Sequence, residues 1–338
     1  RTFALRGGLI VTEAACNSAN FTMDMQALYR RLFPEWPLRR LPDDHPVYRA
    51  HVRLPRPAGL LGVDNGVRLL AVHAPRELSL GLQLGPGPAT RSSFELMGNL
   101  AVLATGRRLL RDGPVPPWPR MPSGRPRTVL RVARIAHDAG ARAEPLAWQR
   151  FAIWLRRAHG MGLQVSEPTD PCRLDARRWP VATLQGTDTL DLSADQRKHL
   201  ADYVRAGGML VVEAVGGADA FARSAREQVL DLVEGPRGPL SLRHPLFRQV
   251  VDARQVRYRR RLAARRRIGR TDPELYALVH EQRVAVVFSP YDLSAGAMGL
   301  AWDGIDGYAT DSARDLLLNL LAAGNGVRGE AAASQAAQ

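Results

Sequence analysis

The sequence predicts an α/β protein of the flavodoxin-like type, with helices covering both faces of a parallel sheet, and it predicts that this fold is duplicated. Continuous apolar runs alternate with segments of helical periodicity, glycine pairs precede two of these runs, and several blocks of sequence recur in the same order. Unbroken apolar strands that alternate with helices are typical of a parallel sheet buried on both faces. A chain of 338 residues has room for about two domains.

The internal repeat is the clearest of these signals. Residues Gly207 to Phe221 match Gly7 to Phe21, with the glycine pair, Val, Glu, Ala and Phe in register. Three more blocks follow in the same order: Asp43 to Arg49 with Leu242 to Arg248, Leu69 to Ser79 with Ala285 to Ser294, and the helical segments that place Asn99 opposite Asn319. Matches in one order indicate a tandem duplication.

The two copies differ in length. Residues 127–206 precede the glycine pair of the second copy, whereas only Arg1 to Arg6 precede that of the first. We therefore expect the first copy to be truncated at its N-terminal half. The predicted organisation is the rear half of a first domain at 1–110, a Pro/Gly-rich linker at 111–126, a complete second domain at 127–326 and a disordered tail at 327–338.

The second copy divides into alternating elements. Apolar runs predict strands at 128–136, 181–186, 209–214 and 285–288, and helical periodicity predicts helices at 145–160, 194–206, 220–233 and 312–323. Ser193 and Gln196 form the pattern of an N-terminal capping box. Gly160 is expected to end its helix, and Gly207 and Gly208 to form a positive-φ turn.

Composition argues against several classes of partner. The formal charge is +14, but every basic residue except Lys198 is arginine, which is typical of a GC-rich coding sequence. A phosphate-binding surface usually contains lysine as well, so nucleic acid is not expected as a partner. Cys16 and Cys172 lack the spacing of a zinc site or a disulfide framework, and we expect neither a metal nor a cofactor.

One strongly basic segment, Val256 to Arg270, could bind an anionic surface, a nucleic acid or an acidic protein. A charged, exposed insertion is the simpler interpretation, because the first copy is much less basic there. No run of eighteen apolar residues occurs. Membrane association is therefore expected only through regions outside this chain.

A family resemblance rests on the glycine-pair strand with "EAACNSANF", on "FPEWPLRRLPDDHPVYR", and on the later P-x-x-L-S motif. Together these segments resemble the bacterial domain of unknown function 4159 family, over most of 127–326 and over the rear half of the same domain in 1–108. The resemblance implies a class I glutamine-amidotransferase-like fold and a bacterial, often membrane-associated, setting. It implies no established activity.

Candidate functional residues follow from the predicted sheet, because ligands of open parallel sheets bind beyond the carboxyl ends of the strands. In the first copy, Glu13 and Cys16 follow one strand, and His73 and Ser79 lie at or after the end of another. In the second copy the candidate ligand-binding residues are Glu213, Gly216, Gly217, Ser289, Asp292 and Ser294. We expect a protein or small-molecule ligand at this edge.

Cys16 is the sharpest catalytic candidate. It lies where amidotransferase-like enzymes have a catalytic thiol, a helix N-terminus would lower the pKa of such a thiol, and His45 could act as its base. However, the flanking residues A-A-C-N-S lack the glycines of the enzymes' turn, and the second copy has Gly216 there. A small side chain packed in a crowded turn is the favoured interpretation.

The histidines and glutamates have simpler interpretations too. His45 and His244 each precede a proline, so they are expected to begin a strand or an edge segment, with Asp43 or Asp44 bonded to the His45 ring. Glu13 and Glu213 are better candidates, because a buried carboxylate at a strand end is costly unless it is paired or used. Each glutamate is expected to form a salt bridge with a nearby arginine.

The favoured function is a non-catalytic ligand-binding or protein-binding α/β module, with the question of catalysis left open. One alternative is an amidotransferase-like hydrolase that uses Cys16, or Glu213 with Ser289. A second alternative is the binding of an anionic surface or a nucleic acid through Val256 to Arg270.

Overall fold

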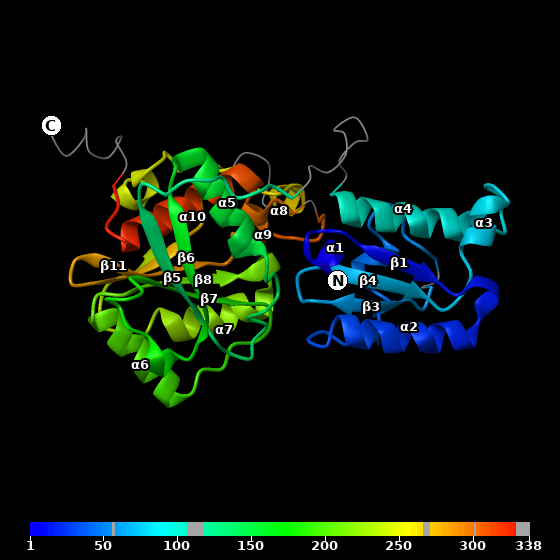
Figure 1. Cartoon of the computed structure of the whole chain (residues 1–338), viewed down its shortest axis with the longest axis horizontal. Helices are drawn as coiled ribbons and strands as arrows, with labels where there is room; N and C mark the ends of the chain where they lie inside the picture. Colours follow the sequence, from blue (N-terminus) through cyan, green and yellow to red (C-terminus); the bar gives the residue numbers. More distant parts are fainter. Residues whose placement is uncertain (56–57, 107–117, 266–270, 301, 329–338) are drawn as a thin grey trace. The chain divides into compact units, whose positions relative to one another are not determined.

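The protein divides into two units, each with its own sheet (Figure 1). The computed structural model describes residues 1–55, 58–106, 118–265, 271–300 and 302–328. Unit 1 comprises Arg1–Trp118 with Ala301–Gly304, and unit 2 comprises Pro119–Leu300 with Ile305–Gln338. The boundary lies within the predicted linker at 111–126. Residues 111–117 of that linker, and 329–338 of the predicted tail, lie outside the described residues.

Unit 2 is built on a seven-stranded sheet in the order β6-β5-β7-β8-β11-β10-β9. The strands are β5 (Val129–Ile135), β6 (Gly162–Thr169), β7 (Val181–Gly186), β8 (Met209–Ala214), β9 (Arg237–Pro239), β10 (Tyr276–His280) and β11 (Arg283–Ser289). The first five in spatial order run parallel, which is the 2-1-3-4-5 order of flavodoxin-like folds. The predicted fold class is therefore confirmed.

The sheet also has strands that the sequence did not predict. β10 and β9 extend it in the antiparallel direction, and β6 forms its other edge. β6 reads GLQVSEPT and is only partly buried, so it lacks the unbroken apolar run that predicts a central strand. By contrast, β8 is buried at every position.

Helices cover both faces of the unit 2 sheet (Figure 1). They are α5 (Ala147–His159), α6 (Ala194–Arg205), α7 (Asp219–Val229), α8 (Arg260–Arg265), α9 (Ser294–Met298) and α10 (Thr310–Gly324). Leu200 of α6 and Phe221 of α7 belong to the core on one face, and Phe151 of α5 and Leu317 of α10 to the core on the other. The helix predicted at 220–233 ends earlier, at Val229.

The structure confirms two predictions about helix ends. The capping box of Ser193 and Gln196 is present, and Gly160 ends α5 with a φ of 65°. The two glycines of the pair have different roles. Gly207 has a φ of 99°, but a Cβ on Gly208 would lie 2.3 Å from the ring of Tyr203. The second glycine therefore permits close packing and does not itself form the positive-φ turn.

Unit 1 has a four-stranded sheet in the order β1-β4-β3-β2. Its elements are α1 (Thr2–Leu5), β1 (Ile10–Glu13), α2 (Ala19–Leu32), β2 (Leu38–Arg40), β3 (Leu61–Asp64), β4 (Leu69–Ala74), α3 (Ser79–Gln83) and α4 (Arg91–Thr105). β1 and β4 are parallel, and β3 and β2 extend the sheet antiparallel. α2 and α4 lie on opposite faces (Figure 1).

The order and directions of these four strands match those of β8-β11-β10-β9 in unit 2. The likeness extends to single hydrogen bonds. Asn99 of α4 accepts two backbone N–H groups at 2.8 Å and donates to Val52 O. Asn319 of α10 accepts two at 2.9 and 3.1 Å and donates to Val251 O. The predicted pairing of the two asparagines thus reflects one shared role.

The same correspondence holds at the start of unit 1. Arg68 donates to Ala4 O in α1 and to Gly8 O. In unit 2, Arg283 donates to Val204 O in α6 and to the carbonyl of the equivalent glycine. α1 therefore occupies the place of the last turn of α6.

The expectation that the His-Pro blocks begin extended segments is wrong. Each block begins a short 3-10 helix, η2 (Pro46–Tyr48) in unit 1 and η6 (Pro245–Arg248) in unit 2. Nδ1 of His45 and of His244 accepts a hydrogen bond from the backbone N–H two residues later. Proline holds the residue before it extended, as predicted, but its own φ suits the first position of a helical turn.

We predict that replacing either asparagine by alanine destabilises its own unit. Asn99→Ala and Asn319→Ala each leave three backbone groups without their side-chain partner, at fully buried positions. The expected loss is about 3 kcal/mol or more, measured by urea unfolding with amide hydrogen exchange to identify the unit affected. Asn20→Ala, at an exposed position of α2, is the control and should change stability by less than about 0.5 kcal/mol. Equal effects from all three variants would contradict the shared role.

Candidate functional site

Glu213 is the penultimate residue of β8 and is almost completely buried, with 1% of its surface exposed. Its Oε1 accepts hydrogen bonds from Leu293 N at 2.8 Å, Ser294 N at 2.6 Å and Ser294 Oγ at 2.9 Å. Its Oε2 accepts one from Gln185 Nε2 at 2.8 Å. The expected arginine salt bridge is therefore wrong, because the start of α9 supplies backbone N–H donors instead. The carboxylate connects the end of β8 to the helix that follows β11.

Asp292 makes a second connection at the same edge. It is fully buried, its Oδ2 accepts from Gly216 N at 2.8 Å, and its Oδ1 accepts from Gly296 N at 2.7 Å. Gly216 has a φ of 69° and Gly217 a φ of 70°. The turn after β8 is thus held against the loop after β11 by a side chain that reaches across.

The pKa values of both carboxyl groups are raised above their ordinary values. Burial and the nearby Asp292 raise the pKa of Glu213 to about 7, although hydrogen bonds from Ser294, Gln185 and Leu293 offset part of the effect. Burial also raises the pKa of Asp292, against the opposing influence of the Arg259 guanidinium. Both shifts follow from removing a charged group from water.

A hollow beside Glu213 lies between the ends of β5 and β7. This is the switch point of the strand order, where flavodoxin-like folds bind ligands. The hollow is lined by Arg134, Glu144, Trp148 and Gln185, among others, and its water-accessible space is about 10 Å³, enough for about one water molecule. Trp148 Nε1 donates to Gln185 Oε1 at 3.0 Å across it. The switch point is therefore nearly filled by the protein itself.

Three residues of this network were missed from the sequence. Gln185, Trp148 and His137 all contribute, with His137 Nε2 lying 3.0 Å from Gln185 O. Gln185 could have been found, because it follows the apolar run of a predicted strand at the same carboxyl edge. Among the predicted residues, Ser289 is near but separate, since its Oγ donates to Tyr291 O at 2.6 Å.

Unit 1 contains the same pair of connections. Glu13 Oε2 accepts from Leu78 N at 2.7 Å and Ser79 N at 2.9 Å, at the start of α3. Cys16 N donates to Glu77 Oε2 at 2.9 Å, as Gly216 N does to Asp292. The carboxylates at the strand ends are thus structural links in both units.

Cys16 is exposed, so the expectation of a small side chain packed in a crowded turn is wrong. Its φ is 53°. No histidine in the described part of the chain hydrogen-bonds to it. His73 lies near the end of β4. Its Nδ1 lies 3.0 Å from Thr12 Oγ1 and its Nε2 lies 3.1 Å from Thr22 Oγ1. Cys16 occupies the left-handed position that Gly216 occupies in unit 2.

The histidines of the His-Pro blocks hydrogen-bond to their own backbone and not to Cys16. His45 Nε2 lies 3.9 Å from the carboxylate of Asp64, so the expected partner, Asp43 or Asp44, is wrong. Burial lowers the pKa of His244, which favours the neutral ring that caps η6.

The basic segment at 256–270 is described as far as Arg265, and Arg266 to Arg270 lie outside the described residues. Arg257 pairs with Asp311 at 3.0 Å. Arg261 lies 3.5 Å from Asp306, to which Arg265 also pairs. Part of the positive charge is thus matched by carboxylates within unit 2.

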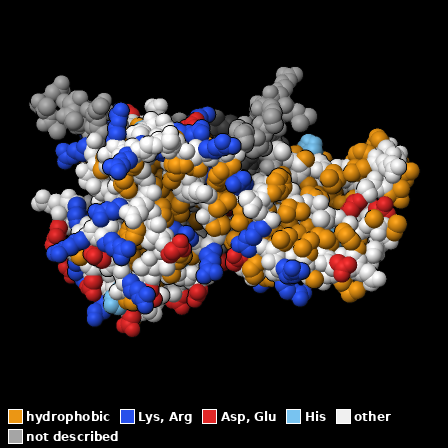
Figure 2. All heavy atoms as spheres, viewed as in Figure 1, with side chains coloured by type: hydrophobic (Ala, Val, Ile, Leu, Met, Phe, Trp, Pro, Cys, Tyr) orange, Lys and Arg blue, Asp and Glu red, His pale blue; other side chains and the backbone are white. Residues whose placement is uncertain are grey.

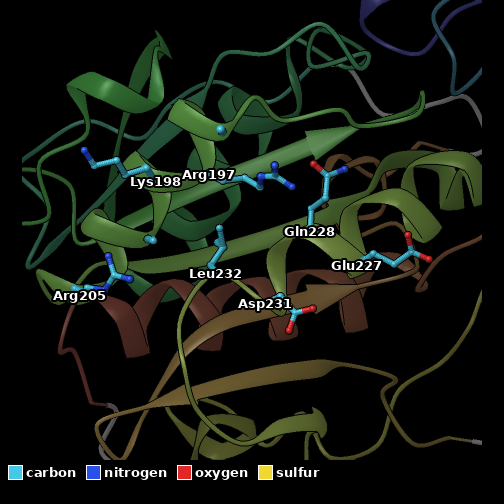
Figure 3. Close-up of a pocket in the computed structure, with 9 residues that line it drawn as sticks. Arg197, Lys198, Arg205, Glu227, Gln228, Asp231 and Leu232 are labelled. Carbon is cyan, nitrogen blue, oxygen red and sulfur yellow. The ribbon is translucent and has the colours of Figure 1, made fainter.

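A groove in unit 2 lies away from the carboxyl edge, between α6 and the end of α7 (Figure 3). Its volume is about 690 Å³. α6 supplies Arg197, Lys198 and Arg205, and the opposite wall carries Glu227 and Asp231. The two walls have opposite charges.

The described residues contain neither a group of three or more His, Cys, Asp or Glu side chains placed to hold a metal ion nor a helix with the length and apolar character needed to cross a membrane.

Comparison with known proteins identifies a family and a distant structural likeness. A family model described as Domain of unknown function (DUF4159) matches residues 1–84 and 131–315. Among solved structures, the chain is similar to a ThuA-like protein from Bacteroides uniformis, with 13% identity and a TM-score of 0.30, covering 62% of this chain and 95% of that one. No curated protein matches the sequence.

We predict that Glu213 makes unit 2 less stable as pH rises. Its folded pKa of about 7 exceeds its unfolded value, so the folded state holds the extra proton. The contribution is complete below about pH 4.5 and is lost on passing pH 7, with a size of up to about 3 kcal/mol. In urea unfolding between pH 4.5 and 8, Glu213→Gln should flatten this decline.

Ser294→Ala provides the matched comparison. It removes one donor to the ionised carboxylate, so the decline should extend to higher pH. A pH profile that is the same in the wild type and in Glu213→Gln would show that Glu213 does not titrate in this range.

Proposed function

The chain belongs to the family described as Domain of unknown function (DUF4159), and from this membership and the structure we propose that it is a non-catalytic protein-binding module. The observation that carries the proposal is the closure of the carboxyl edge. Glu213 and Asp292 bind backbone N–H groups of their own unit, and the switch-point hollow accommodates about one water molecule. Groups engaged in this way are poorly placed to bind substrate.

A protein partner is favoured by the apolar surface of unit 1. Nine large hydrophobic side chains are exposed among the described residues, and seven of them belong to this smaller unit. They are Phe3, Val11, Phe21, Met23, Leu28, Leu80 and Leu84. Figure 2 shows hydrophobic side chains over much of the visible face of unit 1. Concentrations of exposed apolar side chains mark interaction sites, so the proposed binding surface differs from the carboxyl edge expected from the sequence.

We also propose that unit 1 is the rear half of the domain that unit 2 contains whole. The family model matches the chain in two segments, 1–84 and 131–315. The repeated sheet order and the paired contacts of Asn99 with Asn319, and of Glu13 with Glu213, support this relationship.

The alternatives have less support. A hydrolase using Cys16 needs a base beside the thiol, and the described histidines hydrogen-bond elsewhere. One using Glu213 with Ser289 needs the hydroxyl to reach the carboxylate, but Ser289 donates to Tyr291 O. Binding of an anionic surface or nucleic acid through Val256 to Arg270 would compete with Asp306 and Asp311 for Arg257, Arg261 and Arg265.

The reactivity of Cys16 tests the non-catalytic assignment. In a Cys172→Ser background, Cys16 is the one thiol of the chain. We expect iodoacetamide to alkylate it at pH 7 no faster in the folded chain than in the chain unfolded in urea, because no histidine among the described residues hydrogen-bonds to it as a base. A folded rate more than tenfold above the unfolded rate would instead indicate an activated thiol and overturn the proposal.

A further inference from the structure

Apolar side chains that are exposed in unit 1 have covered counterparts in unit 2. Three pairs at equivalent positions show the difference: Phe3 and Tyr203 are 65% and 3% exposed, Val11 and Val211 are 39% and 2%, and Phe21 and Phe221 are 41% and 0%. Because local contacts are repeated between the units, the difference arises from a neighbour that is present in unit 2 and has no equivalent among the described residues of unit 1.

A single segment of unit 2, Trp179–Gly186, covers all three positions. Its first residue accepts a hydrogen bond from Tyr203 Oη at 2.8 Å. Its middle, in β7, pairs in parallel with β8 alongside Val211. Its last residue, a glycine, lies against Phe221 so closely that an added Cβ would be 2.3 Å from the ring.

β1 takes the place of β8 in unit 1 but lies at the edge of its sheet, paired with β4. Natural edge strands are usually protected from pairing by lysine, proline or inward-pointing charge. β1 reads IVTE, and its one charged group, Glu13, is engaged by the backbone of α3. Among the described strands, β1 pairs only with β4, so its outer edge is open to another strand.

We propose that the outer edge of β1 binds a parallel β-strand from a polypeptide segment outside these 338 residues. The partner strand is apolar, about six residues long and ends in glycine, and its flanks cover Phe3 and Phe21. The inference rests on the proposed protein-binding function and names the partner and its mode of binding, which is strand addition at a sheet edge.

The geometry disfavours a second copy of this chain. Two β1 strands related by a two-fold axis present the same patch to each other and would pair antiparallel, whereas the covering strand in unit 2 is parallel. The β7 strand of another copy is also not available, because it is paired on both sides, with β5 and β8.

The glycine requirement follows from the aromatic ring at the end of the site. Phe21 stands at the position of Phe221 in the repeat. A side chain on the last residue of the bound strand would meet this ring, as it would at Gly186 in unit 2. A peptide that differs only at this residue therefore separates specific strand addition from general hydrophobic adhesion.

The test uses the full chain with a capped synthetic peptide of sequence WPVATLQG, which is that of residues 179–186, followed by amide hydrogen exchange. We expect saturating peptide to slow exchange at least tenfold at those β1 amides (10–13) that do not bond to β4. The matched peptide WPVATLQV should give no slowing at the same concentration. Val11→Lys should abolish the slowing of exchange by the peptide. The control Gln164→Lys, in the edge strand β6 of unit 2, should leave the slowing unchanged.

Several outcomes would overturn the inference. One is the absence of slowing in β1 at millimolar peptide, and another is equal slowing with the valine peptide. A third is a dimer, detected by light scattering, that Val11→Lys dissociates, since this would assign the edge to a second copy. The Cys16 alkylation rate is independent of these outcomes, so slow alkylation with an unprotected β1 would reject the strand and leave the non-catalytic assignment standing.

Discussion

A carboxylate at the end of one strand, bonded to the first backbone N–H groups of the helix after the neighbouring strand, organises both units. In unit 2 this is Glu213 with the start of α9, and in unit 1 it is Glu13 with the start of α3. The first N–H groups of a helix have no partner within the helix, so a carboxyl oxygen that accepts from them satisfies groups that would be costly to leave unpaired when buried. The interaction sets where each short helix begins and aligns two adjacent strand ends.

Closure of the carboxyl edge is a consequence of this interaction. Once α9 is held by Glu213, Asp292 lies where it can accept from the turn after β8, and both carboxylates are buried. A flavodoxin-like sheet would ordinarily offer its ligand site at the adjacent switch point, but Trp148 and Gln185 bond across that place. Polar residues that look available in the sequence are therefore used to hold the fold.

The two units also show how one local structure can have different surroundings. Val211 in a central strand and Val11 in an edge strand have equivalent positions in the repeat, yet their exposures are 2% and 39%. Burying an apolar side chain contributes about 25 cal/mol per Å², so the open edge of unit 1 retains a driving force that unit 2 has already satisfied internally. This difference, more than any catalytic arrangement, gives unit 1 its proposed role.

The sequence by itself determined the fold class, the repeat and most elements of unit 2, because apolar periodicity, the capping box at Ser193 and the paired asparagines act locally or recur in register. It also placed several polar residues at the carboxyl edge of the sheet. Only the tertiary structure decided what the polar groups there do. The partners of Glu213 are 28 to 81 residues away along the chain, and sequence spacing does not show whether an arginine or a backbone N–H will reach a buried carboxylate. The edge strands β6 and β9 were missed for a related reason: their residues are half exposed, so pairing with a neighbour, and not their own pattern, makes them strands.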